Sequence, residues 1–114
     1  MRRQWRLCRR EDFARVRQTG QTVNHLWFAL GRAANGLPHN RYGIIVTKRL
    51  GSAVVRNRTR RRLREALRHL HPRLVQGYDL VLVVRQPVAH QPYDQLSSAL
   101  VALLQQARLL KSGD

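Results

Sequence analysis

The residues of this chain best suited to chemistry are the seven arginines between Arg56 and Arg68, where Glu65 is the only acid. Guanidinium groups stay charged at every relevant pH, and their planar fork of donors fits phosphate oxygens. On a helix, like charges three and four residues apart repel each other, whereas ordinary surface helices alternate their signs. The stretch therefore predicts a helix that binds a polyanion, nucleic acid above all. A solvated charged face is the alternative.

The charge of the whole chain points the same way. Its 114 residues carry 22 Lys and Arg against six Asp and Glu, which gives a formal net charge of +16. Such a balance attracts polyanions in general, and the absence of a lipidation signal disfavours an anionic membrane as the target. A hydrophobic content of 43% is enough for one core. We predict a single RNA-binding domain over residues 1–114, with residues 1–9 as a loose basic arm.

Cysteine usage and the N-terminus suggest a compartment. Cys8 is the only cysteine, so neither an internal disulfide nor a cysteine-based zinc cluster can form. The first residues lack the apolar run of a signal peptide, and no apolar run elsewhere is long enough to span a membrane. We expect a cytoplasmic protein without a membrane partner.

The residues that commonly catalyse hydrolysis are not gathered in a pattern. The five histidines are dispersed, and His69 and His71 would point to different sides of a helix. Metal-dependent nucleases need carboxylates that converge on Mg²⁺, but the six acids of this chain are scattered. We predict no catalytic residue and no metal site on the protein. A histidine-driven ribonuclease is the alternative.

A short helix and an extended segment are predicted before the arginine stretch. The acids at residues 11–12 favour the first turn of a helix, and Gly20 is suited to end it. Residues 23–33 indicate extended structure with a bend near residues 24–25, and residues 35–38 have strong turn chemistry. One face of the short helix would hold Phe13, Val16 and Arg17.

The arginine stretch is predicted to follow a buried strand. Residues 41–47 have a near-continuous apolar centre, and residues 48–51 form a basic turn after it. Either Ser52 or Asn57 could cap the helix, which ends before Pro72. The apolar arc that must pack on the sheet comprises Leu63, Ala66, Leu67 and Leu70. The opposite side carries Arg58, Arg60, Arg61, Arg62, Arg64 and Arg68.

A second buried strand and a last helix complete the chain. Residues 79–85 are apolar throughout their centre, and a strand-helix-strand unit of this kind usually pairs its strands in parallel. A loop lies between Pro87 and Pro92, and the segment after it indicates a helix that continues to the polar end at Lys111. The apolar residues at helical spacing are Leu96, Leu100, Leu103, Leu104 and Ala107.

With these segments in hand, residues 42–58 and 64–67 closely resemble the bacterial ribonuclease P protein subunit, whose Arg-Asn-Arg signature sits at residues 56–58. Residues 11–13 with Gly20 look like the first helix of that family. Residues 78–85 look like its last strand, so the resemblance covers nearly the whole chain. It implies an α+β fold, a two-layer α-β-β-β-α-β-α sandwich of ribosomal-protein type. It also implies a left-handed βαβ crossover, although the general rule favours right-handed ones.

The resemblance also implies a function. Ribonuclease P is a ribonucleoprotein endonuclease, a hydrolase that removes the 5′ leader from precursor tRNA in a Mg²⁺-dependent step. The partners would be the catalytic RNA, which carries the chemistry, and precursor tRNA. The protein would bind no cofactor tightly, while the holoenzyme would require Mg²⁺. The alternative is a ribosomal-protein-like or chaperone RNA-binding module without a role in cleavage.

The family's contact residues can be carried over by position. The catalytic RNA would be bound by Lys48, Arg49, Arg56, Asn57, Arg58, Arg60, Arg61, Arg64 and, on charge alone, Arg68. From the residues alone, Asn57 is open to two interpretations, a contact to a base edge, a ribose or a neighbouring arginine, and a helix cap. The single-stranded leader would lie in a cleft on the sheet. Phe13 and Phe28 match aromatic positions there, Arg17 and Gly31 stand where two other cleft aromatics are expected, and Trp27 would add to leader binding.

Overall fold

One mixed sheet organises the computed structural model, which describes residues 1–111. Its strands are β1 (Gln21–Asn24), β2 (Phe28–Ala34), β3 (Arg41–Ile45) and β4 (Tyr78–Val84), in the order β1-β2-β4-β3. Strand β2 pairs antiparallel with both β1 and β4, whereas β3 and β4 are parallel, as the strand-helix-strand pattern predicts. The predicted extended segment is a hairpin whose turn follows Asn24.

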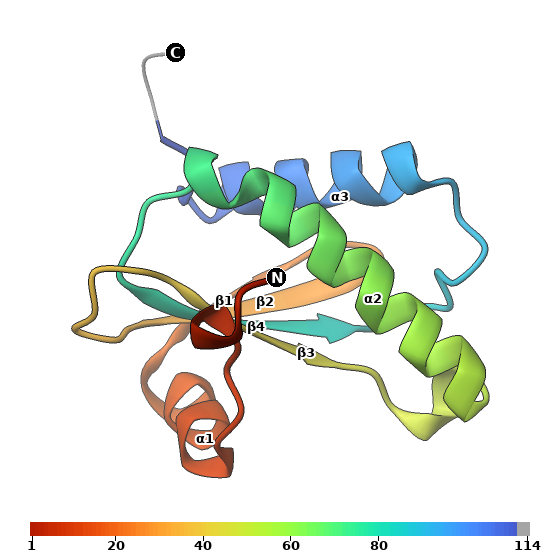
Figure 1. Ribbon diagram of the computed structural model, residues 1–114, viewed down its shortest axis with the longest axis horizontal. Helices are drawn as coiled ribbons and strands as arrows, with labels where there is room; N and C mark the ends of the chain where they lie inside the picture. Colours follow the sequence, from red (N-terminus) through yellow and green to blue (C-terminus); the bar gives the residue numbers. More distant parts are fainter. Residues whose placement is uncertain (112–114) are drawn as a thin grey trace.

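Three helices pack on this sheet, α1 (Arg10–Thr19), α2 (Ala53–Leu70) and α3 (Tyr93–Gln106). The α-β-β-β-α-β-α order is therefore confirmed, with short 3₁₀ turns at Arg3–Trp5, Lys48–Leu50 and His71–Arg73. Helices α2 and α3 cover one face of the sheet, and α1 lies against the opposite face (Figure 1). The two predicted layers thus gain a partial third one from α1. The hand of the β3-α2-β4 crossover stays a prediction.

The two faces of the sheet are buried to different extents. The face under α2 and α3 holds the main core, to which Phe28, Leu82 and Leu63 contribute fully or almost fully buried side chains. The face under α1 has a smaller cluster that includes Val16 and Val81. Because neighbouring residues of a strand point to opposite faces, each strand supplies both clusters. Among residues 1–111, no helix is long and apolar enough to cross a membrane. The last residues of the predicted domain, 112–114, lie outside the described ones.

The start of α2 settles the choice between two capping residues. The Ser52 hydroxyl accepts a hydrogen bond from the Val55 amide at 3.3 Å, which is N-cap geometry. Gly51 precedes it with φ 144°, a conformation that L side chains rarely adopt. Asn57 lies inside the helix, where its Oδ1 accepts from Arg60 Nη1 at 3.2 Å. The cap interpretation of Asn57 is therefore wrong.

The prediction of a loose arm at residues 1–9 is wrong. Leu7 is only 5% exposed, and its amide donates to the Tyr42 carbonyl at 2.8 Å, so the segment extends the edge of β3. The Trp5 ring stacks on His71 with 3.6 Å between ring centroids. Apolar Leu7 and Trp5 hold the segment in place, a role that its basic composition hides.

The last helix is shorter than predicted, because it ends at Gln106 rather than continuing to Lys111. Arg108 has φ 59° and turns the chain back. Leu109 is fully buried, and its carbonyl accepts from the Val75 amide at 2.7 Å. The apolar residues after Gln106 continue the core without continuing the helix.

A buried carboxylate joins α1 to the sheet. Asp79, near the start of β4, is fully buried and accepts two hydrogen bonds from Arg41, donated by Nε and Nη2, at 2.8 Å each. Asn35 Nδ2 also donates to Asp79, at 3.0 Å, and Arg15 of α1 donates to it through Nη2. Burial of Asp79 opposes its ionisation, but the hydrogen bonds from Arg41 and Asn35 and the two guanidinium charges outweigh burial and lower its pKa. Asp79 therefore stays ionised and fixes three segments around β4.

We expect Asp79→Asn to lower the free energy of unfolding at pH 7 by about 3 kcal/mol, because two guanidinium groups lose their counter-charge. Since the pKa of Asp79 is lowered in the folded state, its stabilisation is present above the ordinary value of 3.8 and is lost as the pH falls through the folded-state pKa. Urea unfolding of wild type and variant from pH 7 down to pH 2 measures the difference, which should shrink only in acid. A difference that stays constant over this range would contradict the ionised assignment.

Candidate nucleic-acid interface

The outer side of α2 and the 3₁₀ turn before it carry the predicted RNA-binding residues. The apolar side of α2 packs into the main core through Leu63, Ala66, Leu67 and Leu70, as predicted, which leaves the arginines outside. Exposed side chains of the set are Lys48, Arg49, Asn57, Arg58, Arg61 and Arg68, and half-buried ones are Arg56, Arg60 and Arg64. We call this set the basic face.

The basic face holds its cations close together. Burial lowers the pKa of Arg64, and the charges of Arg6 and Arg60 lower it further. Arg6 belongs to the N-terminal segment, which the sequence predicts as loose, so its place beside α2 could not be found from spacing. A set of like charges held this close attracts polyanions strongly.

Two of the arginines on α2 also hold a neighbouring loop. Arg62 Nη1 donates to the Ala89 carbonyl at 2.7 Å and to the Val88 carbonyl at 3.3 Å, and Nη2 contacts the Gln91 carbonyl. Arg58 Nε donates to the same Ala89 carbonyl at 3.1 Å. Arg62 is thus a structural residue, and Arg58 keeps only the end of its guanidinium for a ligand.

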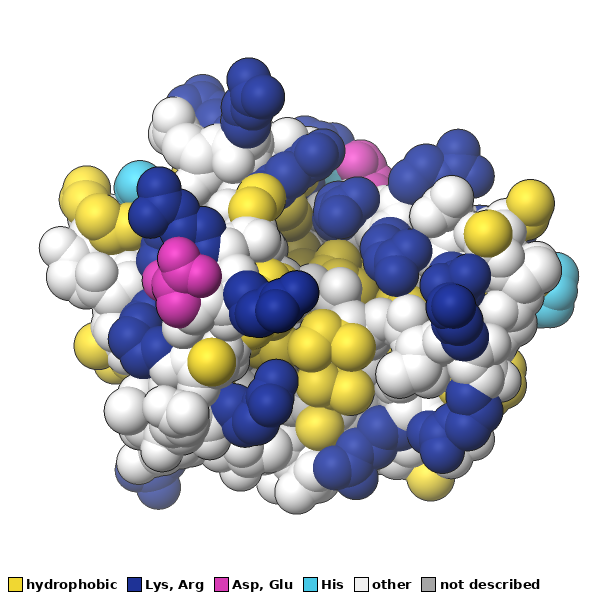
Figure 2. Space-filling model, turned by 90° about the horizontal axis from the view of Figure 1, so that it is seen from below, with side chains coloured by type: hydrophobic (Ala, Val, Ile, Leu, Met, Phe, Trp, Pro, Cys, Tyr) yellow, Lys and Arg dark blue, Asp and Glu magenta, His cyan; other side chains and the backbone are white. Residues whose placement is uncertain are grey.

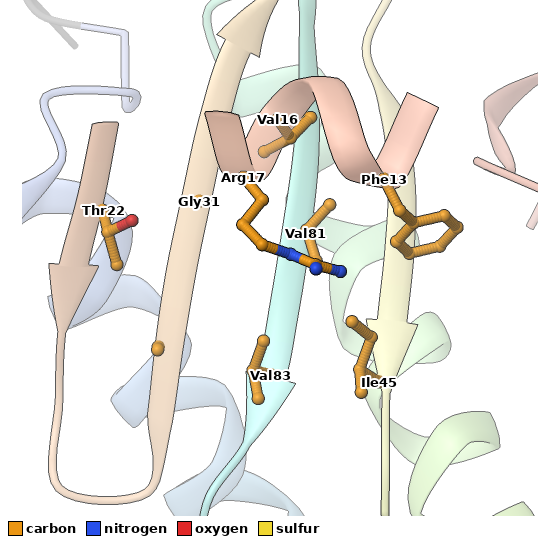
Figure 3. A pocket seen from close by; sticks show the side chains of 9 residues that line it. Phe13, Val16, Arg17, Thr22, Gly31, Ile45, Val81 and Val83 are labelled. Carbon is orange, nitrogen blue, oxygen red and sulfur yellow. The ribbon is translucent and has the colours of Figure 1, made fainter. Parts of the chain in front are cut away.

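A second surface is a groove of about 110 Å³ on the sheet face beside α1. Its lining consists of Phe13, Val16, Arg17, Thr22, Ala29, Gly31, Ile45, Val81 and Val83. Figure 2 shows hydrophobic side chains at the floor of a hollow on this face, with Lys and Arg side chains around it. In Figure 3 the Arg17 side chain extends from α1 across the sheet above β4, and Phe13 leaves the same helix toward β3.

Two glycines shape the floor of the groove. A Cβ at Gly43 would lie 2.5 Å from the Phe13 ring, so the ring sits directly on the bare backbone of β3. A Cβ at Gly31 would meet only Val16, at 3.1 Å, and β2 is correspondingly open at that point. The groove therefore has a flat apolar floor with one guanidinium group above it.

The four residues predicted to bind the leader are not brought together. Phe13 and Arg17 line the groove, whereas Phe28 is 0% exposed and lies in the main core beneath α2 and α3. Trp27 is half-buried and packs against that same core. The assignment of Phe28 as an accessible aromatic is wrong. Phe28 shares the two-residue alternation of Leu30, so this periodicity could have placed it in the core.

The two surfaces suit different parts of a nucleic acid. Guanidinium groups bind phosphates, and an apolar floor with a cation above it can hold unpaired bases and their backbone. Among residues 1–111, no group of three or more His, Cys, Asp or Glu side chains comes together that could hold a metal ion. The two surfaces thus differ in chemistry, one being cationic and the other mainly apolar.

Comparisons with known proteins agree on one family. A family model described as Ribonuclease P matches residues 1–108. Ribonuclease P protein components are similar to this chain. That of Chloroflexus aurantiacus is 50% identical over 111 residues, which are 96% of this chain and 82% of that protein. That of Roseiflexus castenholzii is 43% identical over 112 residues, 97% of this chain and 92% of that protein.

Solved structures of the same family are similar to this fold. The ribonuclease P protein of Staphylococcus aureus superposes with a TM-score of 0.86 at 29% identity, covering 94% of this chain and 98% of that one. The ribonuclease P protein of Thermotoga maritima gives a TM-score of 0.82 at 26% identity, covering 95% and 98%. The α+β fold expected from the resemblance is therefore confirmed.

The arginines of α2 should differ in their effect on stability. We expect Arg62→Ala to lower the free energy of unfolding by about 1–3 kcal/mol, because the Gln91 carbonyl loses its side-chain donor and the Val88 and Ala89 carbonyls each lose one of two donors. Arg61→Ala, the matched control one residue away, should change it by less than about 0.5 kcal/mol. Urea unfolding at neutral pH measures both variants, and an equal loss in the two would contradict the structural role of Arg62.

Proposed function

This chain belongs to the ribonuclease P protein family, and on that premise we propose that its basic face binds the catalytic RNA while its groove holds the 5′ leader of precursor tRNA. Membership in the family makes it the protein component of a ribonuclease that processes tRNA. The observation that carries the finer proposal is the presence of two separate surfaces of different chemistry. One is a set of arginines on α2, and the other is an apolar groove with Arg17 above it.

The basic face suits a folded RNA. Its cations are spread along α2 and the turn before it, so they can neutralise several phosphates of one partner at once. Arg61 is exposed, and no hydrogen bond to another described residue holds its side chain, which leaves its guanidinium free for phosphate. Binding of this kind releases counterions and therefore weakens as salt rises.

The groove suits a single strand. The Phe13 ring offers a stacking surface, and Arg17 offers a cation for the backbone. Apart from Thr22, the other lining residues are glycine or have aliphatic side chains, so most of the groove contacts bases without selecting among them through hydrogen bonds. The groove would bind leaders of varied sequence and would hold the precursor more tightly than the mature tRNA.

Mg²⁺ enters this proposal through the holoenzyme. Hydrolysis of a phosphodiester by Mg²⁺ needs oxygen ligands that converge on the ion. Among residues 1–111, no three acids, histidines or cysteines gather that could hold the ion, and Asp79 and Glu65 are paired with arginines. The proposal therefore gives the chain no metal ligand and leaves the chemistry to the RNA. The protein's contribution is to reduce repulsion between phosphates and to retain the substrate.

Reconstitution tests the proposed function. At low Mg²⁺, adding this chain to the catalytic RNA should raise the rate of leader removal from precursor tRNA, because phosphate repulsion falls and the leader is held. A leaderless tRNA serves as the matched substrate, and its binding should not change. Cleavage rates and substrate affinities are measured side by side. An unchanged rate, or cleavage of precursor tRNA by the protein without RNA, would refute the proposal.

The two surfaces should separate by mutation. Phe13→Ala should weaken binding of leader-bearing tRNA to the holoenzyme by about 5- to 150-fold, the range for losing a stacked base, with assembly unchanged. Arg61→Ala should weaken assembly with the catalytic RNA and reduce the dependence of its log affinity on log salt by about one phosphate contact. Titrations at several salt concentrations measure assembly with the catalytic RNA and binding of leader-bearing tRNA. If the two variants weakened both steps equally, the assignment of separate roles to the two surfaces would be wrong.

A further inference from the structure

Another hollow, of about 370 Å³, lies between the arginines of α2 and the first turn of α3. Its lining is Arg58, Arg61, Arg62, Glu65 and Tyr93, and we call it the α2–α3 pocket. Tyr93 is 38% exposed, whereas the other Phe, Trp and Tyr side chains are buried or half-buried. The family resemblance assigns no role to Tyr93 or to Glu65.

The pocket is held in shape by hydrogen bonds. Arg62 and Arg58 donate to carbonyls of the loop between Val88 and Gln91, and this loop leads directly to Tyr93. Val88 and Ala89 are almost fully buried, which anchors the loop from its other side. The Tyr93 ring therefore has a fixed position beside α2, so binding a ligand there costs little conformational entropy.

The Glu65 carboxylate is a hydrogen-bond acceptor in a pocket that is otherwise lined by arginines and Tyr93. Arg68 Nη2 donates to its Oε1 at 2.6 Å, and His69 Nε2 lies 3.0 Å from the same oxygen. The hydrogen bond from Arg68 lowers the pKa of Glu65, so the carboxylate is ionised at neutral pH. Each carboxylate oxygen has two lone pairs, which leaves capacity for a further donor.

We propose that the α2–α3 pocket holds one unpaired nucleotide of the catalytic RNA, with its base stacked on Tyr93, its phosphate on Arg61 and Arg58, and an amino group of the base donating to Glu65. The proposal rests on the proposed function and adds a base-reading site to an interface that otherwise contacts phosphates. An amino donor restricts the base to cytosine, guanine or adenine. Among these, carboxylates commonly pair with the cytosine amino group. An acidic peptide fits less well, because Glu65 would repel it.

Tyr93 variants of the full chain test the stacking contact. Tyr93→Ala should weaken binding to the catalytic RNA by about 5- to 150-fold at fixed salt, the range for one stacked base. Tyr93→Phe, which keeps the ring, should bind within about threefold of wild type. The salt dependence of Tyr93→Ala should equal that of wild type, because no phosphate contact is lost. Wild-type affinity for Tyr93→Ala, or an equal loss for Tyr93→Phe, would overturn the proposal.

Glu65→Ala tests the role of the Glu65 carboxylate as a hydrogen-bond acceptor, and it leaves the residues of α3 unchanged. Simple electrostatics predicts tighter RNA binding, since a negative charge leaves a basic face and Arg68 is released from its partner. The proposal predicts the opposite, an affinity at least threefold weaker, because the amino group of the base loses its acceptor. Tighter or unchanged binding would rule out base recognition by Glu65.

Chemical probing of the RNA in the complex locates the nucleotide. With wild-type protein, one unpaired base should be protected at its pairing edge, and Tyr93→Ala should restore its reactivity while phosphate protection persists. If no unpaired base changes, the pocket does not hold one. If wild-type protein fails to bind the catalytic RNA at all, the proposed function fails, and that outcome is distinct from equal binding by wild type and variants.

Discussion

The ionised carboxylate of Asp79 is the contact on which the arrangement of this molecule most depends. It is fully buried, and donors from α1, β3 and the segment after β2 converge on it. A buried charge without partners would be costly, so the three donors must stay in place together. Because Arg15 is one of them, α1 is held against the sheet, and with it Phe13 and Arg17. The shape of the groove therefore depends on a residue that does not line it.

Two opposing effects act on helix α2, repulsion between its arginines and burial of its apolar side. Its arginines repel one another, and burial of Leu63, Leu67 and Leu70 offsets this by holding the helix to the sheet. Arg62 and Arg58 relieve part of the repulsion in another way, since loop carbonyls accept from them. The same bonds set the position of the loop that leads to α3. The helix that carries most of the basic face thus also organises the structure around it.

The sheet separates the two surfaces because its faces are covered unequally. Helices α2 and α3 close one face completely, and α1 closes only part of the other (Figure 1). On the open side, Gly43 lets the Phe13 ring lie against the backbone of β3, and Gly31 adds no side chain to the groove that it lines. The basic face and the groove can therefore engage two different RNA segments at once. The proposed function requires such a separation, because it assigns one surface to the catalytic RNA and the other to the leader.

The parallel β3–β4 pair and the amphipathic α2 could be predicted from the sequence, because each depends on local spacing, and the resemblance to a family supplied the full order of elements. The preference for a polyanion, which follows from charge, stays a prediction. The sequence also favoured Phe13 and Arg17 as neighbours on one helical face, and the structure places both at the groove. Other features depend on contacts between distant segments. Phe28 is turned into the core by its pairing with Val84, and Leu7 binds the N-terminal segment to Tyr42. Tyr93 lies beside α2 because α3 shares a core with that helix and Arg62 holds the intervening loop. The spacing of residues along one segment does not show which distant segment it contacts. Only the tertiary structure therefore decided which face of the sheet stays open and which aromatic ring lies beside the arginines.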